Sequence, residues 1–283
     1  MTRALVLAGG GVAGIAWETG VLRGIEEADP QLAASLLAAD VIIGTSAGAA
    51  VAAQVTSGRS LADLYDDQVN GPSPEIDVQM EMDELIGRFI QAVQGADSRT
   101  DVLRRIGRMA AATETVTEAE RRAVIERRLP SHDWPDGDVR IVAVEIDAGE
   151  PVVFDRTTGV ALVDAVAASC AVPGIWPPVT IGDRRYMDGG VRSTSNVDLA
   201  AGCDRIVVLS PAAADQPGLA GRTLAEEVAS FDQIPVTIID ASPEAVAAFG
   251  TNPLSATTRR PAATAGRRQG LEWAGKLGPT WAG

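Results

Sequence analysis

The stretch DVIIGTSAGAA, residues 40–50, places one serine between two glycines directly after a run of apolar residues. Its centre, Gly44-Thr45-Ser46-Ala47-Gly48, has the pattern G-x-S-x-G, which is typical of a serine held on a tight turn between a strand and a helix. The pattern alone does not decide whether the serine reacts. A reactive Ser46 also needs donors that stabilise an oxyanion and a base that accepts its proton.

A glycine-rich turn also occurs earlier in the chain. Residues 4–8, ALVLA, predict a short buried strand, and a helix is expected over about 15–28. Between them stands Gly9-Gly10-Gly11-Val12-Ala13-Gly14. This spacing also occurs in dinucleotide sites, but those require an acidic residue near the end of the second strand, where this chain has the Ser46 turn. Backbone N–H groups of the loop can instead form an oxyanion hole.

The order of elements predicts an α/β fold. Two strand–turn–helix units within 58 residues are the expected opening of a mainly parallel, doubly wound sheet. Hairpins are expected at 139–155 and around Gly182-Asp183, and buried strands at 204–210 and 235–240. Ser242-Pro243 predicts the start of a further helix.

A helical insertion is predicted over about 60–130. Thr117 and Glu120 fit a capping box, and Pro130 ends that helix. An apolar stripe at helical spacing is expected to cover the core, with a cap over a substrate groove as the alternative; it comprises Met82, Leu85, Ile86, Phe89, Ile90 and Val93. Residues 251–283 are expected to form a basic, poorly defined, solvated tail, with Arg259, Arg260, Arg267, Arg268 and Lys276 against Glu272.

Composition excludes several classes of protein. The 283 residues carry a net charge of −14, which argues against nucleic acid as a partner and against general attraction to anionic lipid. Two cysteines, Cys170 and Cys203, are too few for a disulfide framework or a zinc site, so neither a metal nor another cofactor is expected. With no apolar run of about 18 residues and no evident signal peptide, we expect a cytoplasmic protein and leave peripheral membrane contact open.

Two residues could supply the base. His132 is the single histidine and lies in a polar loop, LPSHDWP, where nothing directs it toward Ser46. Asp188 follows a short strand and precedes Gly189 and Gly190, in RRYMDGGVRSTSN. Glycines allow close approach of the backbone, but Asp-Gly is also a common turn pair, so the residues alone leave the role of Asp188 open.

Taken in order, the two glycine-rich turns and Asp188-Gly189-Gly190 resemble the patatin-like phospholipases. The segment ASCAVPGIWPPV, residues 168–179, resembles the part of that family that precedes the catalytic aspartate. The resemblance implies one patatin-like domain over 1–283, with a three-layer α/β/α fold and a Ser–Asp dyad of Ser46 as nucleophile and Asp188 as base. It also implies an oxyanion hole from the N–H groups of Gly9, Gly10 and Gly11, with Gly14, Gly44, Gly48, Gly189 and Gly190 supporting the motifs.

By this resemblance the chain hydrolyses carboxylic esters of lipids, as a phospholipase A, a lysophospholipase or a lipid esterase. Many relatives carry Arg or Lys where this chain has Ala13, which puts preference for charged phospholipids in doubt. The alternatives are a weak or inactive protein that binds lipid or acyl groups, and an acyltransferase. The head group, the acyl chain and the oligomeric state are not predicted.

Overall fold

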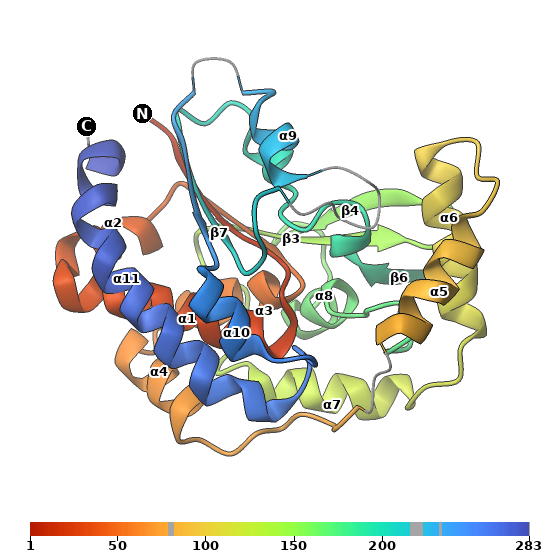
Figure 1. Ribbon diagram of the computed structural model, residues 1–283. Helices are drawn as coiled ribbons and strands as arrows, with labels where there is room; N and C mark the ends of the chain where they lie inside the picture. The colour runs from red at the N-terminus through yellow and green to blue at the C-terminus, as the bar shows by residue number, and fades with distance from the viewer. Residues whose placement is uncertain (79–81, 216–222, 232–233, 283) are drawn as a thin grey trace.

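The computed structural model describes residues 1–78, 82–215, 223–231 and 234–282. An eight-stranded sheet lies at its centre, in the order β5-β6-β3-β2-β1-β7-β8, with β4 paired to β3 (Figure 1). Five strands run parallel: β1 (Arg3–Leu7), β2 (Val41–Thr45), β3 (Asp138–Glu145), β7 (Arg205–Ser210) and β8 (Val236–Asp240). Two further strands, β4 (Glu150–Phe154) and β6 (Arg184–Asp188), run antiparallel to β3. The eighth strand, β5 (Val179–Ile181), runs antiparallel to β6.

Helices cover both faces of this sheet, which confirms the predicted fold class. Alternate residues of β1 point to opposite sides, Leu5 and Leu7 into one apolar cluster and Ala4 and Val6 into another. The larger cluster packs under α1 (Gly11–Ala28), α2 (Pro30–Leu37), α3 (Ala47–Val55), α4 (Leu61–Val69), α7 (Glu118–Arg128), α8 (Leu162–Ser169), α10 (Pro243–Phe249) and α11 (Arg259–Ala282). The thinner layer consists of η2 (Val197–Ala200) and α9 (Leu224–Val228), while η1 (Gly189–Val191) and η3 (Ala256–Thr258) are single turns.

The predicted insertion contains α4, α5 (Met82–Val93), α6 (Arg99–Ala112) and α7. The capping box of Thr117 and Glu120 is present at the start of α7. The apolar stripe is only partly buried, because α6 and the ends of β3 and β6 pack against one side of α5 and bury Phe89. Ile86 and Ile90 are 46% and 65% exposed, so the prediction that the whole stripe covers the core is wrong for these two. The side chain of Met82 lies outside the described residues.

Pro30 begins a helix as well as ending one. The sequence predicts a helix only over about 15–28, but the structure starts a second helix, α2, at Pro30. Asp29 caps this helix, because its carboxylate accepts the N–H groups of Gln31 and Leu32. Proline is well tolerated at a first helical position since its missing N–H would have no intrahelical acceptor.

The predicted solvated tail is wrong. Residues 259–282 form α11, which packs along α1 on the outside of the helical layer (Figure 1). The two helix backbones approach so closely that a Cβ at Gly24 would overlap the carbonyl of Arg267, and one at Gly270 would overlap that of Val21. Trp281 is 2% exposed, and its indole donates to Ser35. Single small residues allow this contact, and they give a weak signal in the sequence.

Candidate active site

One edge of β3 brings Ser46 and Asp188 together. Thr45 of β2 pairs with Val142, and Asp188 of β6 pairs with the next residue, Ala143. Strand β4 pairs with β3 at both Val142 and Ala143 and therefore occupies one edge of β3. Strands β2 and β6 consequently share the other edge. Because β2 is parallel and β6 antiparallel to β3, the last residues of both strands meet.

Ser46 occupies the sharp turn that the G-x-S-x-G pattern predicts. Its φ of 54° and ψ of −113° lie in a region that non-glycine residues rarely adopt, and only 8% of the residue is exposed. Helix α3 starts at the next residue. The turn requires Gly48, where a Cβ would overlap the carbonyl of Leu7, and Gly44, where one would lie 2.6 Å from the Gly48 oxygen.

The end of α8 fixes the backbone around both side chains. The Ser169 hydroxyl accepts the N–H of Ser46 at 2.9 Å and donates to the Val142 carbonyl at 2.6 Å. The Cys170 thiol donates to the Ser46 carbonyl at 3.1 Å. The Ala171 carbonyl accepts the N–H of Asp188 at 3.0 Å. Three consecutive residues therefore hold the two strand ends in register.

Asp188 is a buried carboxyl, only 4% exposed. Burial raises its pKa to about 6, although hydrogen bonds from the Ser46 side chain and the Gly190 N–H, and the charge of Arg121, act to lower it. The Gly190 N–H donates to Oδ1 at 2.7 Å and so fixes the orientation of the carboxylate. Gly189 is needed because a Cβ there would lie 2.4 Å from the Val142 oxygen, which is closer than the two atoms can approach. The carboxyl thus ionises near neutral pH beside the Ser46 hydroxyl.

The first glycine-rich turn lies against Ser46, but not all of its N–H groups are available. Gly9 donates to the Thr194 carbonyl at 2.8 Å, so the prediction that Gly9 contributes an oxyanion donor is wrong. The N–H groups of Gly10 and Gly11 have no hydrogen-bond acceptor among the described residues. They stand at the N-terminus of α1, whose dipole favours negative charge. Gly14 lets this helix lie close to Ala47.

A small pocket, partly open to solvent, lies between Ser46, Gly11 and Trp176. Its wall contains a buried ionic cluster in which Glu75 accepts hydrogen bonds from both Arg121 and Arg128. Burial acts to raise the pKa of Glu75, but the charges of Arg128 and Arg121 outweigh it and the pKa falls. One carboxylate between two guanidiniums leaves a net positive charge beside the pocket.

Two donors in this wall have no acceptor among the described residues, Arg121 Nε and Trp176 Nε1. The guanidinium of Arg121 stacks over the Trp176 ring at 3.9 Å from the centroid. Buried donors without partners are costly in folded proteins and are commonly found at functional sites. The pocket therefore offers polar groups that the protein itself does not satisfy.

The structure does not bring His132 to this site. His132 lies on the exposed loop after α7, where its Nε2 is 2.9 Å from the Glu126 carbonyl, and it does not line the pocket of Ser46. Cys170 touches Ser46, but burial raises the pKa of its thiol to about 11, so it stays protonated. Among the described residues, no group of three His, Cys, Asp or Glu side chains could hold a metal ion.

Comparison with known families agrees with this arrangement. The family model described as Patatin-like phospholipase matches residues 5–201, a span that includes both glycine-rich turns and Asp188. The chain belongs to the patatin-like phospholipase family. This membership places the protein among the lipid hydrolases in general, and the resemblance seen in its motifs is confirmed. No curated protein matches the sequence.

Two solved structures are similar to the protein at low sequence identity. VipD from Legionella pneumophila is 12% identical, with a TM-score of 0.48, over 97% of this chain and 67% of VipD. The type III effector protein ExoU is 16% identical, with a TM-score of 0.38, over 95% of this chain. The chain spans only 53% of the length of ExoU.

Several residues of the site are missed by reasoning from motifs. Ser169 and Cys170 fall in the segment ASCAVPGIWPPV, but its letters do not say that it fixes the backbone of Ser46. Glu75, Arg121 and Arg128 belong to segments whose helical patterns gave no functional signal. Only the fold brings these charges together, since 46 residues or more separate the glutamate from each arginine.

Proposed function

We propose that the protein hydrolyses carboxylic esters of lipids, with Ser46 as nucleophile and Asp188 as general base. The observation that carries this proposal is the pairing of a serine in a strained turn with a buried carboxyl whose pKa is about 6. A carboxylate with a pKa near the working pH accepts a proton far better than an ordinary aspartate. Family membership supports the lipid ester as substrate.

The reaction runs in two steps. The Ser46 Oγ attacks the ester carbonyl carbon while Asp188 takes the hydroxyl proton, which forms a tetrahedral oxyanion. The N–H groups of Gly10 and Gly11 donate to this oxyanion, a contact worth about 2.7–4 kcal/mol for each donor in comparable enzymes. The intermediate collapses, Asp188 returns the proton to the leaving alcohol, and an acyl-Ser46 ester remains.

Water completes the cycle. Asp188 takes a proton from a water molecule that attacks the acyl-enzyme, and collapse of the second oxyanion releases the fatty acid and returns the proton to Ser46. Because every proton moves through one carboxyl, the proposal requires neither a histidine nor a metal.

The test compares wild type with Ser46→Ala on p-nitrophenyl hexanoate. We expect turnover by wild type and a loss of at least about 10³-fold in Ser46→Ala, since removal of a nucleophile leaves only binding and electrostatic contributions. Circular dichroism of both proteins checks that the fold is retained. Equal rates in the two proteins would reject the proposal.

A further inference from the structure

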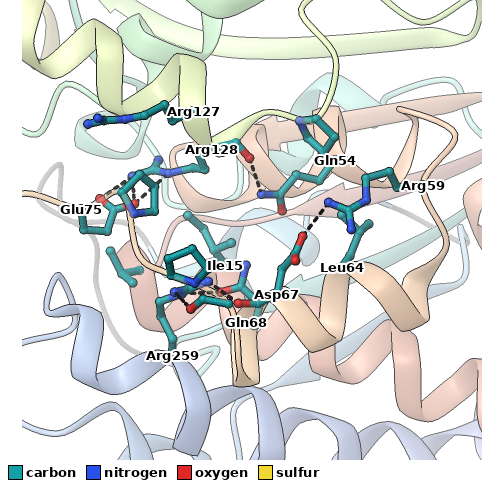
Figure 2. Close-up of a pocket in the computed structure, with 15 residues that line it drawn as sticks. Ile15, Gln54, Arg59, Leu64, Asp67, Gln68, Glu75, Arg127, Arg128 and Arg259 are labelled. Carbon is teal, nitrogen blue, oxygen red and sulfur yellow. Dashed lines mark hydrogen bonds and ion pairs between the residues drawn. The ribbon is translucent and has the colours of Figure 1, made fainter.

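A second pocket of about 220 Å³, partly open to solvent, adjoins the pocket of Ser46 (Figure 2). This volume is smaller than that of a drug-sized ligand site, but it accommodates a compact group such as a phosphate. Four residues line both pockets and place them next to each other: Val12, Ile15, Glu75 and Arg128. The second pocket therefore lies directly beside the position of an ester held at Ser46.

The second pocket, which we call the arginine pocket, has a positive wall in a protein of strongly negative net charge. Two ion pairs are internal to it, Arg59 with Asp67 at 2.6 Å and Arg128 with Glu75 at 2.7 Å. The charged residues in the wall are four arginines and two carboxylates, a net charge of +2: Arg59, Arg127, Arg128, Arg259, Asp67 and Glu75.

Arg127 and Arg259 are the two arginines of this wall that form no ion pair with a described residue. Burial lowers the pKa of Arg259, although the nearby charges of Glu75 and Asp67 act to raise it. Figure 2 shows Arg127 on the side of the pocket formed by α7 and Arg259 on the opposite side, next to Gln68. The guanidinium of Arg259 donates to Gln68 Oε1 and to the backbone carbonyls of Asp67 and Gly71, all of which are neutral acceptors. Within the described residues, Arg127 forms no ion pair.

The same wall is unsuited to a quaternary ammonium group. Such cations are recognised by the faces of aromatic rings, and none of the described residues that line the arginine pocket is aromatic. Guanidinium groups would also repel a cation, whereas they bind phosphate oxygens through charge-assisted hydrogen bonds.

We propose that the arginine pocket binds the phosphate of an anionic lipid head group while the ester of the same molecule lies at Ser46. This assignment rests on the proposed ester hydrolysis and names its substrate class, a phospholipid with net negative charge. Arg127 and Arg259 determine the preference for an anionic over a choline head group.

The test uses monomeric dihexanoyl phosphatidylglycerol and dihexanoyl phosphatidylcholine, which differ only in the head group. We expect wild type to prefer phosphatidylglycerol by about tenfold in kcat/KM and Arg127→Gln to lose most of that preference, since one charge-assisted contact is worth about this factor. The matched control is Arg122→Gln, which removes the same charge from the same helix outside the pocket. An equal ratio in wild type and Arg127→Gln, or no preference in wild type, would overturn the assignment.

Hydrolysis of p-nitrophenyl hexanoate separates this proposal from the proposed function. This ester carries no head group, so its hydrolysis by wild type tests Ser46 and Asp188 without involving the arginine pocket. If wild type does not hydrolyse this ester at all, the proposed function is rejected. The arginine pocket is then tested by ligand binding alone.

Binding is measured by calorimetry on Ser46→Ala, which needs no catalysis. We expect glycerol 1-phosphate to bind, and to bind about tenfold more weakly when Arg127→Gln is added. The absence of binding would overturn the proposal. Inorganic phosphate serves as the second probe. If it binds as tightly as glycerol 1-phosphate and wild type shows no preference between the two lipids, the pocket binds a free anion. That result would overturn the head-group assignment.

Discussion

Asp188 meets Ser46 because the two residues end strands that share one edge of β3. Thr45 and Asp188 pair with the adjacent residues Val142 and Ala143, from opposite directions. Ser169 fills the junction, since its hydroxyl bonds both to the Ser46 N–H and to the Val142 carbonyl. The geometry of the pair is therefore a property of the sheet.

The pH dependence of ester hydrolysis should report the ionisation of Asp188. Only the ionised carboxyl accepts the Ser46 proton, and its pKa is raised to about 6 mainly by burial. We expect kcat/KM to rise with pH through a midpoint near 6 and to level off above it, measured with p-nitrophenyl hexanoate.

Two variants check the origin of that midpoint. Arg121→Met removes a charge that lowers the pKa of Asp188, so the midpoint should move to higher pH. His132→Gln should leave the profile unchanged, because His132 lies outside the pocket of Ser46. A profile that disappears in His132→Gln would mean that the base is the histidine.

The Asp188→Asn variant should be more stable than wild type at pH 8. The folded-state pKa of about 6 lies above the ordinary value of 3.8, so ionising Asp188 costs stability as the pH rises from about 4 to 6, and the full cost is present above 6. Asparagine does not ionise, so the Asp188→Asn variant avoids this loss of unfolding free energy, which is on the order of 3 kcal/mol. Urea unfolding at pH 8 and pH 4 measures it; a stability difference that does not shrink at pH 4 would contradict this explanation.

Ser169→Ala should weaken both the fold and the reaction. The substitution leaves the Ser46 N–H and the Val142 carbonyl without their buried partner, a loss of about 1–3 kcal/mol in the free energy of unfolding. We also expect a lower kcat, because the Ser46 turn loses one of its contacts. Ser131→Ala, in an exposed loop, is the control and should change neither quantity. Wild-type stability and kcat in Ser169→Ala would show that the turn does not depend on this hydroxyl.

The packing of α11 on α1 can be tested at two glycines. At Gly24 a Cβ would overlap the Arg267 carbonyl, so Gly24→Ala should reduce the free energy of unfolding by about 1–3 kcal/mol or more. At Gly275 a Cβ would meet nothing within 4 Å, so Gly275→Ala should be neutral or stabilise the helix by about 0.5–1 kcal/mol. Urea unfolding compares the two; equal effects would mean that the helices do not depend on this close approach.

The sequence predicts the fold class and the sharp turn at Ser46 well, because glycine-rich turns and apolar strands are local signals. Asp188 needed the resemblance to a family, since an Asp-Gly pair alone also fits an ordinary turn. The role of Gly9 was predicted wrongly because its N–H partner, Thr194, is distant in sequence. The solvated tail was predicted wrongly because the packing of α11 depends on single small residues rather than on an apolar stripe. The cluster of Glu75, Arg121 and Arg128 depends wholly on tertiary structure.

No helix among the described residues is both long and apolar enough to cross a membrane. The proposed contact with lipid concerns the two adjoining pockets, of which one holds Ser46 and the other carries the arginines. The assays with monomeric lipids address those pockets without a membrane.

Labelling with a fluorophosphonate measures whether Asp188 activates Ser46. The reagent reacts with an activated serine and leaves a phosphonyl group that peptide mass spectrometry locates. At pH 8 we predict a single adduct on Ser46 in wild type and labelling at least about tenfold slower in Asp188→Asn. No adduct on Ser46, or equal labelling rates in the two proteins, would show that Asp188 does not activate Ser46.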